Sequence, residues 1–282
     1  GKGLPAEVIP VEVPSVEGIG HAEMLAALGV GFASVTLMLG PRSDHAVVAK
    51  QLELTRAISG EASAVLLDAT DPDVMEATLY AETPESPTHD TILPLGGRRD
   101  VTRLAATALQ GDEAVLPLPS GAPYGKIEID TDACTLCLAC VSLCPAGALG
   151  DNPEKPSVRF QETACLQCGL CASTCPETAI TLTPQLDLRK EALTYKTLNE
   201  EEPFECIECG VPFGVRSTIE NIVAKLEDKH WMYKGSDNTR LIQMCDNCRI
   251  AAQYHQENSP FKMGDRPMVR TTEDDLKERD GE

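Results

Sequence analysis

The chain has 282 residues, of which 24 are basic and 44 are acidic, so its net charge is −20. The hydrophobic content of 42% can supply a core, which excludes a wholly disordered chain, and the length suggests two or three modules. A strongly acidic chain with 4% aromatic residues is not expected to bind nucleic acid or an anionic membrane surface. The expected partners are therefore proteins or small redox groups.

Residues 1–112 alternate between strand and helix patterns, which predicts an α/β domain with a mostly parallel sheet. The stretch 4–13 has the pattern of a strand that starts inside a domain, which raises the hypothesis that the chain is part of a longer protein. The further predicted strands are 33–39, 63–69 and 91–95, and the predicted helices are 21–28, 44–58, 72–80 and 100–109. The uncharged stretch 24–41 is interpreted as a helix and a strand joined by a glycine turn, with no membrane insertion.

Two turns of this domain have the position of an anion-binding loop, because each follows a predicted strand and precedes a helix. They cover residues 40–43 and 96–99, and neither has the glycine spacing of a nucleotide-binding loop. Both are therefore expected to be simple connections, with a phosphate site as the alternative. His45 is expected to be a solvated residue at the start of a helix and not a catalyst.

All twelve cysteines lie between residues 134 and 248, in short spacings that are typical of metal ligands. Two runs share the pattern C-x₂-C-x₂-C-x₃-C followed by proline: the first is Cys134, Cys137, Cys140 and Cys144, and the second is Cys165, Cys168, Cys171 and Cys175. Each cysteine of the second run lies 31 positions after its counterpart (165 against 134, 175 against 144). Disulfide frameworks belong to short secreted chains, so this pattern instead indicates a reducing compartment, most simply the cytoplasm.

On these two runs, residues 124–187 resemble a bacterial-type ferredoxin that carries two 4Fe-4S clusters. The resemblance implies a βαββαβ fold, one-electron transfer at low potential, and a fourth cysteine in each run that binds the cluster of the other run. It implies that cluster one is held by Cys134, Cys137, Cys140 and Cys175, and cluster two by Cys165, Cys168, Cys171 and Cys144. Clusters that only brace the fold are the alternative. Five leucines are expected to exclude water from the clusters: Leu136, Leu138, Leu143, Leu166 and Leu170.

Residues 200–258 are predicted to form a small Cys₄ module of the zinc-ribbon type. Its expected ligands are Cys206, Cys209, Cys245 and Cys248. A structural zinc is the expected occupant, and a rubredoxin-like iron or a third cluster is the alternative. The histidines close enough in sequence to replace a thiolate are His230 and His255, and both are expected to be surface residues. A helix between the cysteine pairs is predicted from the capping box Ser217-x-x-Glu220 and from one apolar face, formed by Ile219, Ile222, Val223 and Leu226.

The remaining segments are expected to be connections or tails. Linkers are predicted at 113–123 and near 184–203 from their proline and small residues, and an acidic tail is predicted at 259–282. The order of modules resembles the C-terminal half of larger proteobacterial 4Fe-4S proteins, on the motifs at 132–140, 204–206 and 244–248. In that resemblance, residues 1–112 are similar to the α/β module of the hydrogenase delta-subunit type. Because this stretch has no cysteine, its expected role is docking.

The sequence therefore predicts an electron-transfer protein or subunit that passes single electrons between protein redox partners. It is not expected to be an enzyme by itself, because it has only 5 histidines and every cysteine is assigned to a metal site. The larger resemblance implies a link to a formate dehydrogenase or to heterodisulfide-reductase-like machinery. Two alternatives stay open: a redox-sensing regulatory or scaffold protein, and a reductase subunit that carries a flavin on the α/β domain.

Overall fold

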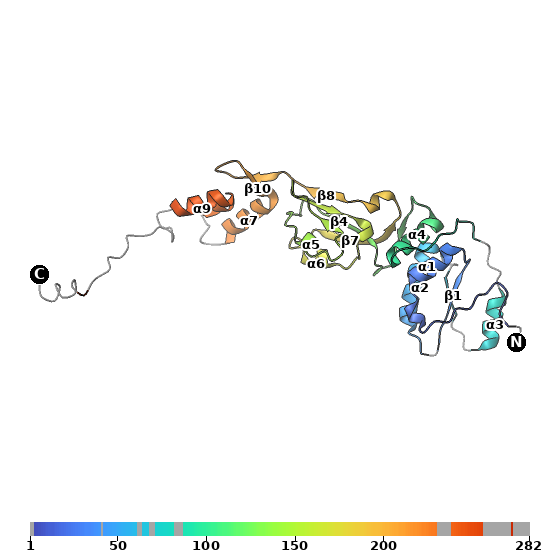
Figure 1. Ribbon diagram of the computed structural model, residues 1–282. Coiled ribbons are helices and arrows are strands. Elements are labelled where there is room, and N and C mark those ends of the chain that lie inside the picture. Colours follow the sequence, from blue (N-terminus) through green and yellow to red (C-terminus); the bar gives the residue numbers. More distant parts are fainter. Residues whose placement is uncertain are drawn as a thin grey trace, which may run out of the picture. The chain divides into compact units, whose positions relative to one another are not determined.

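The computed structural model describes residues 3–40, 42–60, 64–67, 71–81, 87–229, 238–255 and 272, and Figure 1 shows their ribbon. The chain divides into two compact units, Gly1–Glu200 and Glu201–Glu282. The described residues form a mixed α/β structure with four small sheets. None of the helices in these ranges has both the length and the apolar character that crossing a membrane requires.

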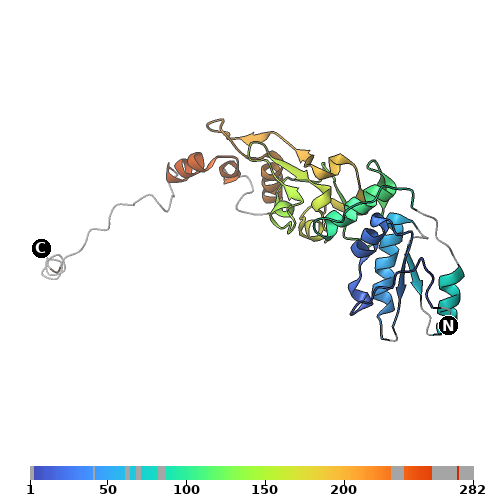
Figure 2. The ribbon, with the colours of Figure 1, turned by 45° about the vertical axis from the view of Figure 1, so that its right-hand side comes forward.

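The first unit begins with a small α/β arrangement. Its helices are α1 (His21–Val30), α2 (His45–Ser59), α3 (Pro72–Ala81) and α4 (Arg98–Gln110), and its strands are β1 (Val35–Met38) and β2 (Ala64–Leu67). The two strands pair in parallel, and α1 and α2 lie beside them in both views (Figures 1 and 2). The carboxylate of Asp44 caps α2 by accepting the backbone N–H groups of Ala46 and Val47, which fixes where the helix begins.

Two of the predicted strands are absent, so this parallel sheet has two strands in the described residues. Residues 91–95 run along α1 instead, where the N–H of Ile92 donates to the carbonyl of Gly29 at 2.9 Å. Pro94 cannot donate to a sheet ladder, which disfavours a strand here. Residues 4–13 also form no strand; Pro5 and Pro10 interrupt them, and the side chains of Ile9 and Val11 are exposed.

Gly29 allows α1 to pack closely against residue 92 and α4. A Cβ added at Gly29 would lie 2.8 Å from Ile92 Cδ1 and 3.2 Å from Ala105 Cβ. We therefore expect Gly29→Leu to lower the free energy of unfolding by about 1–3 kcal/mol through overpacking. Gly18→Leu is the matched control, because a Cβ there meets nothing within 4 Å. Chemical denaturation followed by circular dichroism compares the two variants, and equal stabilities would contradict the close packing.

The cysteine runs lie in the second half of the same unit. Its elements, in chain order, are β3 (Val115–Pro117), β4 (Gly125–Ile129), α5 (Ala139–Ser142), β5 (Leu149–Gly150), β6 (Ser157–Phe160), α6 (Leu170–Thr174), β7 (Ile180–Asp187) and β8 (Lys196–Glu200). Two antiparallel sheets result, in the orders β3-β7-β4 and β5-β6-β8. The predicted linkers at 113–123 and 184–203 are therefore not plain connections, because β3 and β8 add an outer strand to each sheet.

One hydrophobic core joins the two halves of this unit. It brings helices α1, α2 and α4 together with Tyr124 and the end of β7; its buried members are Leu25, Leu28, Leu54, Ile58, Ala105, Ala106, Ala122, Tyr124, Leu186 and Leu188. Arg103 of α4 strengthens the junction by donating to the carbonyls of Asp187, Leu188 and Arg189 at 2.6, 2.6 and 2.9 Å. The segment predicted as a separate docking domain is thus packed directly onto the cysteine-bearing half.

His21 links α1 and α2 to the residue before β4. Its Nδ1 donates to Gln51 Oε1 at 2.9 Å, because that oxygen also accepts the His21 backbone N–H and so is an acceptor. Its Nε2 therefore accepts the hydroxyl proton of Tyr124 at 2.8 Å. The Tyr124 ring in turn lies against the guanidinium of Arg99, whose carbon is 4.4 Å from the ring centroid. This network holds Arg99 in a fixed position.

We expect this junction to weaken in mild acid. Burial lowers the pKa of His21, although its hydrogen bond to Gln51 acts in the opposite direction. The unfolded chain therefore binds the proton more readily, so the stability contribution is full above about pH 6.5 and is lost as the pH falls below it. Hydrogen exchange at the α1 amides, corrected for intrinsic rates, should show less protection at about pH 5.5 than at about pH 7. The neutral variant His21→Gln should show a smaller change, and an equal change would contradict this role.

Among the described residues of the second unit, a hairpin and three helices are present. Its elements are β9 (Pro203–Glu205), β10 (Pro212–Val215), α7 (Arg216–Lys229), α8 (Asn238–Ile242) and α9 (Asp246–His255). The predicted capping box is wrong, because α7 begins before Ser217; the Ser217 N–H and hydroxyl donate instead to the Glu201 carboxylate at 3.0 and 3.1 Å. Of the predicted apolar face, Ile219 is buried but Ile222 is exposed. His230 and the side chain of His255 lie outside the described residues, as does the predicted tail apart from residue 272.

Candidate metal centres

The 31-residue repeat of the cysteine runs extends to the backbone. Left-handed φ angles occur at residues 136, 138 and 147, and again 31 positions later at residues 167, 169 and 178. Four of these six are not glycine, namely Leu136, Leu138, Gln167 and Thr178, so the conformation is retained at a steric cost. It turns backbone N–H groups toward sulfur: Gln167 N–H donates to Cys165 Sγ and Ala179 N–H to Cys175 Sγ, both at 3.4 Å. The second loop and the turn that follows it are therefore shaped to stabilise thiolates.

A small cavity collects three cysteines of the first run and one of the second. Its sulfur-bearing lining residues are Cys134, Cys137, Cys140 and Cys175. The rest of its lining is mainly apolar and includes Ile129, Leu136, Val158 and Ile180. Four thiols around one apolar cavity suit a 4Fe-4S cluster, which takes one thiolate at each iron. The combination is the crosswise one that the resemblance implies for cluster one.

The fourth cysteine of the first run, Cys144, lies near Cys165 of the second run. Burial raises the pKa of Cys165, and the nearby Cys144 acts in the same direction. The backbone and side-chain N–H groups of Gln167 act against that rise, as does Arg99. Burial likewise raises the pKa of Cys140 to about 11, so its proton must leave when iron binds.

All twelve cysteines lie in the described residues, and none of them forms a disulfide. Along each run the exposure also repeats, because Cys137 and its counterpart Cys168 are the exposed members. The middle of each loop therefore brings sulfur to the protein surface. A cluster bound there would have one corner close to solvent and to an approaching partner.

Three of the five leucines expected to exclude water do not do so. Leu136 is buried, with 1% of its surface exposed, but Leu143, Leu166 and Leu170 are 54%, 41% and 47% exposed. A loop that wraps around a cavity turns only some of its side chains inward and leaves the others outside. The surface beside the exposed cysteines is consequently apolar, and the sequence has no charged residue at 133–150 or 163–176.

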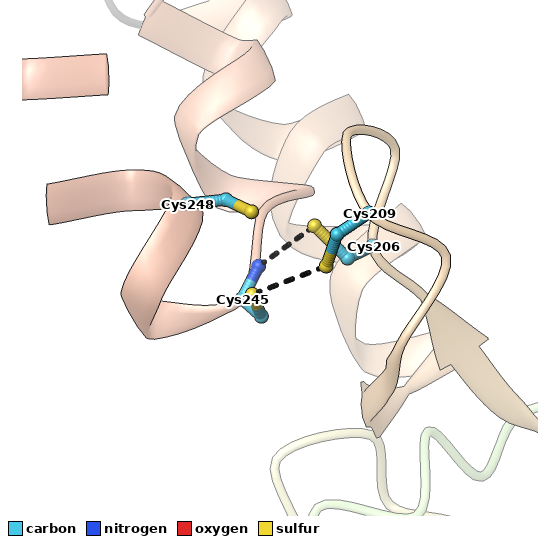
Figure 3. A group of neighbouring side chains, drawn as sticks. All are labelled: Cys206, Cys209, Cys245 and Cys248. Carbon is cyan, nitrogen blue, oxygen red and sulfur yellow. Dashed lines mark hydrogen bonds between the residues drawn. The ribbon is translucent and has the colours of Figure 1, made fainter. Parts of the chain in front are cut away.

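The C-terminal cysteines form a tighter group than those of the two runs. The sulfurs of Cys206, Cys209, Cys245 and Cys248 all lie within 4.8 Å of one another (Figure 3). Cys209 Sγ and Cys245 Sγ are 3.7 Å apart, close to the spacing of about 3.8 Å that a tetrahedral zinc with Zn–S bonds of about 2.3 Å requires. In the described part of the chain the eight cysteines of 134–175 form no group this tight, which suits a polynuclear cluster better than a single ion.

Backbone turns and backbone N–H groups shape the C-terminal Cys₄ site. Gly210 has the left-handed φ of 73° that the turn after Cys209 needs, and its N–H donates to the Cys206 carbonyl at 2.8 Å. The Cys245 N–H donates to Cys206 Sγ at 3.3 Å (Figure 3). Desolvation acts to raise the pKa of Cys206, but backbone N–H groups of Cys245, Cys209 and Glu208 outweigh it and lower the pKa to about 6. One thiolate is therefore available at neutral pH before a metal arrives.

Charged residues in and beside the candidate anion-binding turns at 40–43 and 96–99 make other contacts. Arg98 Nε and Nη2 donate to the Glu23 carboxylate at 2.7 Å each, and Arg99 donates to three backbone carbonyls. At 40–43, where residue 41 lies outside the described residues, the adjoining carboxylates of Glu17 and Asp44 oppose a bound anion. Neither turn supports the phosphate alternative. His45 is exposed in the first turn of α2, as the sequence predicts.

The cysteine loops, the backbone turned toward sulfur and the apolar cavity define an iron–sulfur protein. Residues 133–180 match the family model of the 4Fe-4S dicluster domain. A comparison with curated proteins gives no match. The chain therefore contains a ferredoxin-type 4Fe-4S domain that holds at least one iron–sulfur cluster, and it has a separate Cys₄ group of metal-binding type.

Proposed function

We propose that this chain is an electron-transfer protein or subunit that relays single electrons through two 4Fe-4S clusters between protein redox partners. The observation that carries the proposal is the cavity in which Cys175 joins Cys134, Cys137 and Cys140. A ligand shared between the runs ties the two loops together, so that both clusters lie close to each other. Cluster two is assigned to Cys165, Cys168, Cys171 and Cys144. When bound, each cluster supplies one-electron redox chemistry.

The residues around the clusters have two tasks in this proposal. Leu136 and its apolar neighbours keep water from cluster one, while backbone N–H groups stabilise the thiolates. Cys137 and Cys168 bring the clusters to an uncharged surface with exposed leucines, where a redox protein can approach closely. Away from that surface, the net charge of −20 steers association with basic faces of partners and makes it sensitive to salt.

The proposal also covers the C-terminal Cys₄ group, the cellular compartment and the partner system. The Cys₄ group is assigned a structural zinc, because four thiolates close the coordination sphere and leave no open position for substrate. The compartment is assigned to the cytoplasm, where thiols stay reduced. The link to a formate dehydrogenase or to heterodisulfide-reductase-like machinery rests on the sequence resemblance alone.

A reductive titration of the anaerobically reconstituted chain tests the function. We expect a broad visible absorbance that bleaches on reduction and takes up about two electrons per chain, one for each cluster. The reduced chain should then return those electrons to a one-electron acceptor. A double variant, Cys134→Ala with Cys165→Ala, serves as the control and should take up none. Iron-loaded protein whose absorbance does not respond to a low-potential reductant would contradict electron transfer.

A further inference from the structure

The two cysteine loops are related by the 31-residue repeat, so each difference between them is visible at matching positions. Gln167 stands where the first loop has Leu136, and Glu177 stands where the other half has Ala146. Arg99 reaches only the second loop, from α4. Each of these three differences lies closer to one predicted cluster than to the other, so it changes the electrostatic surroundings of that cluster more strongly.

Gln167 places a hydrogen-bond donor on a ligand of cluster two. Its Nε2 donates to the Lys126 carbonyl at 3.0 Å and lies 3.6 Å from Cys165 Sγ. The Lys126 carbonyl can only accept a hydrogen bond, so the side-chain atom of Gln167 that faces it must be the amide nitrogen and not the amide oxygen. The second N–H of that nitrogen then points to Cys165 Sγ. The corresponding Leu136 in the first loop is apolar and buried.

The backbone of β4 makes room for this amide. A Cβ added at Gly125 would lie 2.6 Å from Gln167 Nε2, so a side chain at that position would displace the amide from the sulfur. The position 31 residues later is Pro156, which offers no equivalent space. The donor on Cys165 is therefore built by two residues, Gln167 and Gly125, and is specific to the second loop.

Arg99 adds a positive charge on the same side. Its guanidinium donates to the carbonyls of Pro123, Thr163 and Cys165 at 2.6, 3.0 and 2.8 Å. All three acceptors are neutral, so these bonds fix the position of the charge without cancelling it. The guanidinium carbon of Arg99 also lies 4.4 Å from the centroid of the Tyr124 ring, which further restricts the position of the guanidinium. The second loop itself has no charged residue from 163 to 176.

Glu177 places a negative charge near cluster one, opposite in sign to the charge that Arg99 places near cluster two. It is half-buried and lines the cavity formed by Cys134, Cys137, Cys140 and Cys175. A reduced cluster carries one more negative charge than an oxidised one, so a donor or a cation favours reduction and a carboxylate opposes it. All three differences therefore act in the same direction.

We propose that cluster two is the more easily reduced of the two, because Gln167 and Arg99 stabilise its reduced form while Glu177 disfavours reduction of cluster one. An electron that enters the chain then comes to rest preferentially on cluster two, beside α4. This inference rests on the proposed function, since it needs both clusters. It assigns to the α/β half a role beyond docking, which is to place Arg99 next to the second loop.

A potentiometric titration of the intact protein, followed by electron paramagnetic resonance, tests the proposal. We expect two resolved one-electron steps whose equilibrium constants differ at least tenfold, which corresponds to 59 mV. Gln167→Leu should chiefly lower the higher reduction potential, which belongs to cluster two. Glu177→Gln should chiefly raise the lower reduction potential, which belongs to cluster one. Each variant therefore narrows the separation between the two potentials. Glu113→Gln, which removes the same charge at an exposed position before β3, should move neither step.

Two results would overturn the inference while leaving the proposed function intact. They are two clusters with coincident steps, and a Gln167→Leu variant in which the lower step moves and the upper step does not. A protein that binds only one cluster would overturn the proposed function as well.

Discussion

Replacing Cys175 with alanine is expected to remove the same cluster as replacing Cys134, although the two residues belong to different runs. The cavity places Cys175 with the first three cysteines of the first run, so either change takes one ligand from the same cluster. Iron content should fall from about eight to about four per chain in both variants. The electron paramagnetic resonance spectra of the remaining cluster should coincide.

The complementary pair supplies the control. Cys144→Ala and Cys165→Ala should both remove cluster two, leaving a second spectrum that is common to these variants and different from the first. If each cluster were held within one run, Cys175→Ala would instead match Cys165→Ala. That outcome would contradict the crosswise assignment while leaving the presence of two clusters intact.

Removing one ligand of the C-terminal Cys₄ group is expected to unfold the end of the second unit. Cys248 lies in the first turn of α9, and its partners Cys206 and Cys209 lie in the loop after β9, so the metal joins two segments that are distant in sequence. Structural zinc sites contribute about 10–16 kcal/mol of binding free energy in small domains, whereas α9 leaves Ile250 and Tyr254 exposed and so gains little from its own packing. Cys248→Ala should therefore lose one zinc per chain and the hydrogen-exchange protection of α9.

The neighbouring variant Asn247→Ala provides the matched control, because Asn247 is exposed in the same turn and is not a predicted ligand. It should keep its zinc and the protection of α9. Iron content should stay unchanged in both variants, since the cysteines of the first unit are a separate set. Protection of α9 that survives the loss of metal would show that the site does not support the fold.

The elements of the first unit that the sequence predicts correctly are those with strong local signals. The helices predicted at 44–58 and 100–109 are found as α2 and α4, and the Asp44 carboxylate that caps α2 lies within the same segment. The cysteine runs are equally local, and their repeat identifies the two matching halves without any structure. Local chemistry of this kind determines an element regardless of what packs against it.

The errors come from interactions that are distant in sequence. Residues 115–117 read as a linker, but they pair with β7 about 70 positions later, and no local pattern reports that pairing. Residues 91–95 read as a strand, yet they pack against Gly29 of α1 instead of joining the sheet. The capping box failed because a carboxylate outside the helix, that of Glu201, accepts the Ser217 N–H.

The residues that tune the site were missed for different reasons. From the sequence, Arg99 is only part of a candidate anion-binding turn, because its three carbonyl acceptors lie 24 to 66 positions away in sequence. Gln167 and Glu177 did carry a signal. When the two halves are aligned at the 31-residue repeat, Gln167 matches Leu136 and Glu177 matches Ala146. These two mismatches mark positions where the halves differ in chemistry.

The electron relay requires that the eight thiols between residues 134 and 175 hold two iron–sulfur clusters. Measuring iron, acid-labile sulfide and zinc together on protein purified without oxygen tests this requirement. We predict about eight irons and about eight sulfides per chain, with a single zinc in addition. Zinc in several equivalents with no acid-labile sulfide would contradict the claim, because such a chain could not carry an electron through these loops.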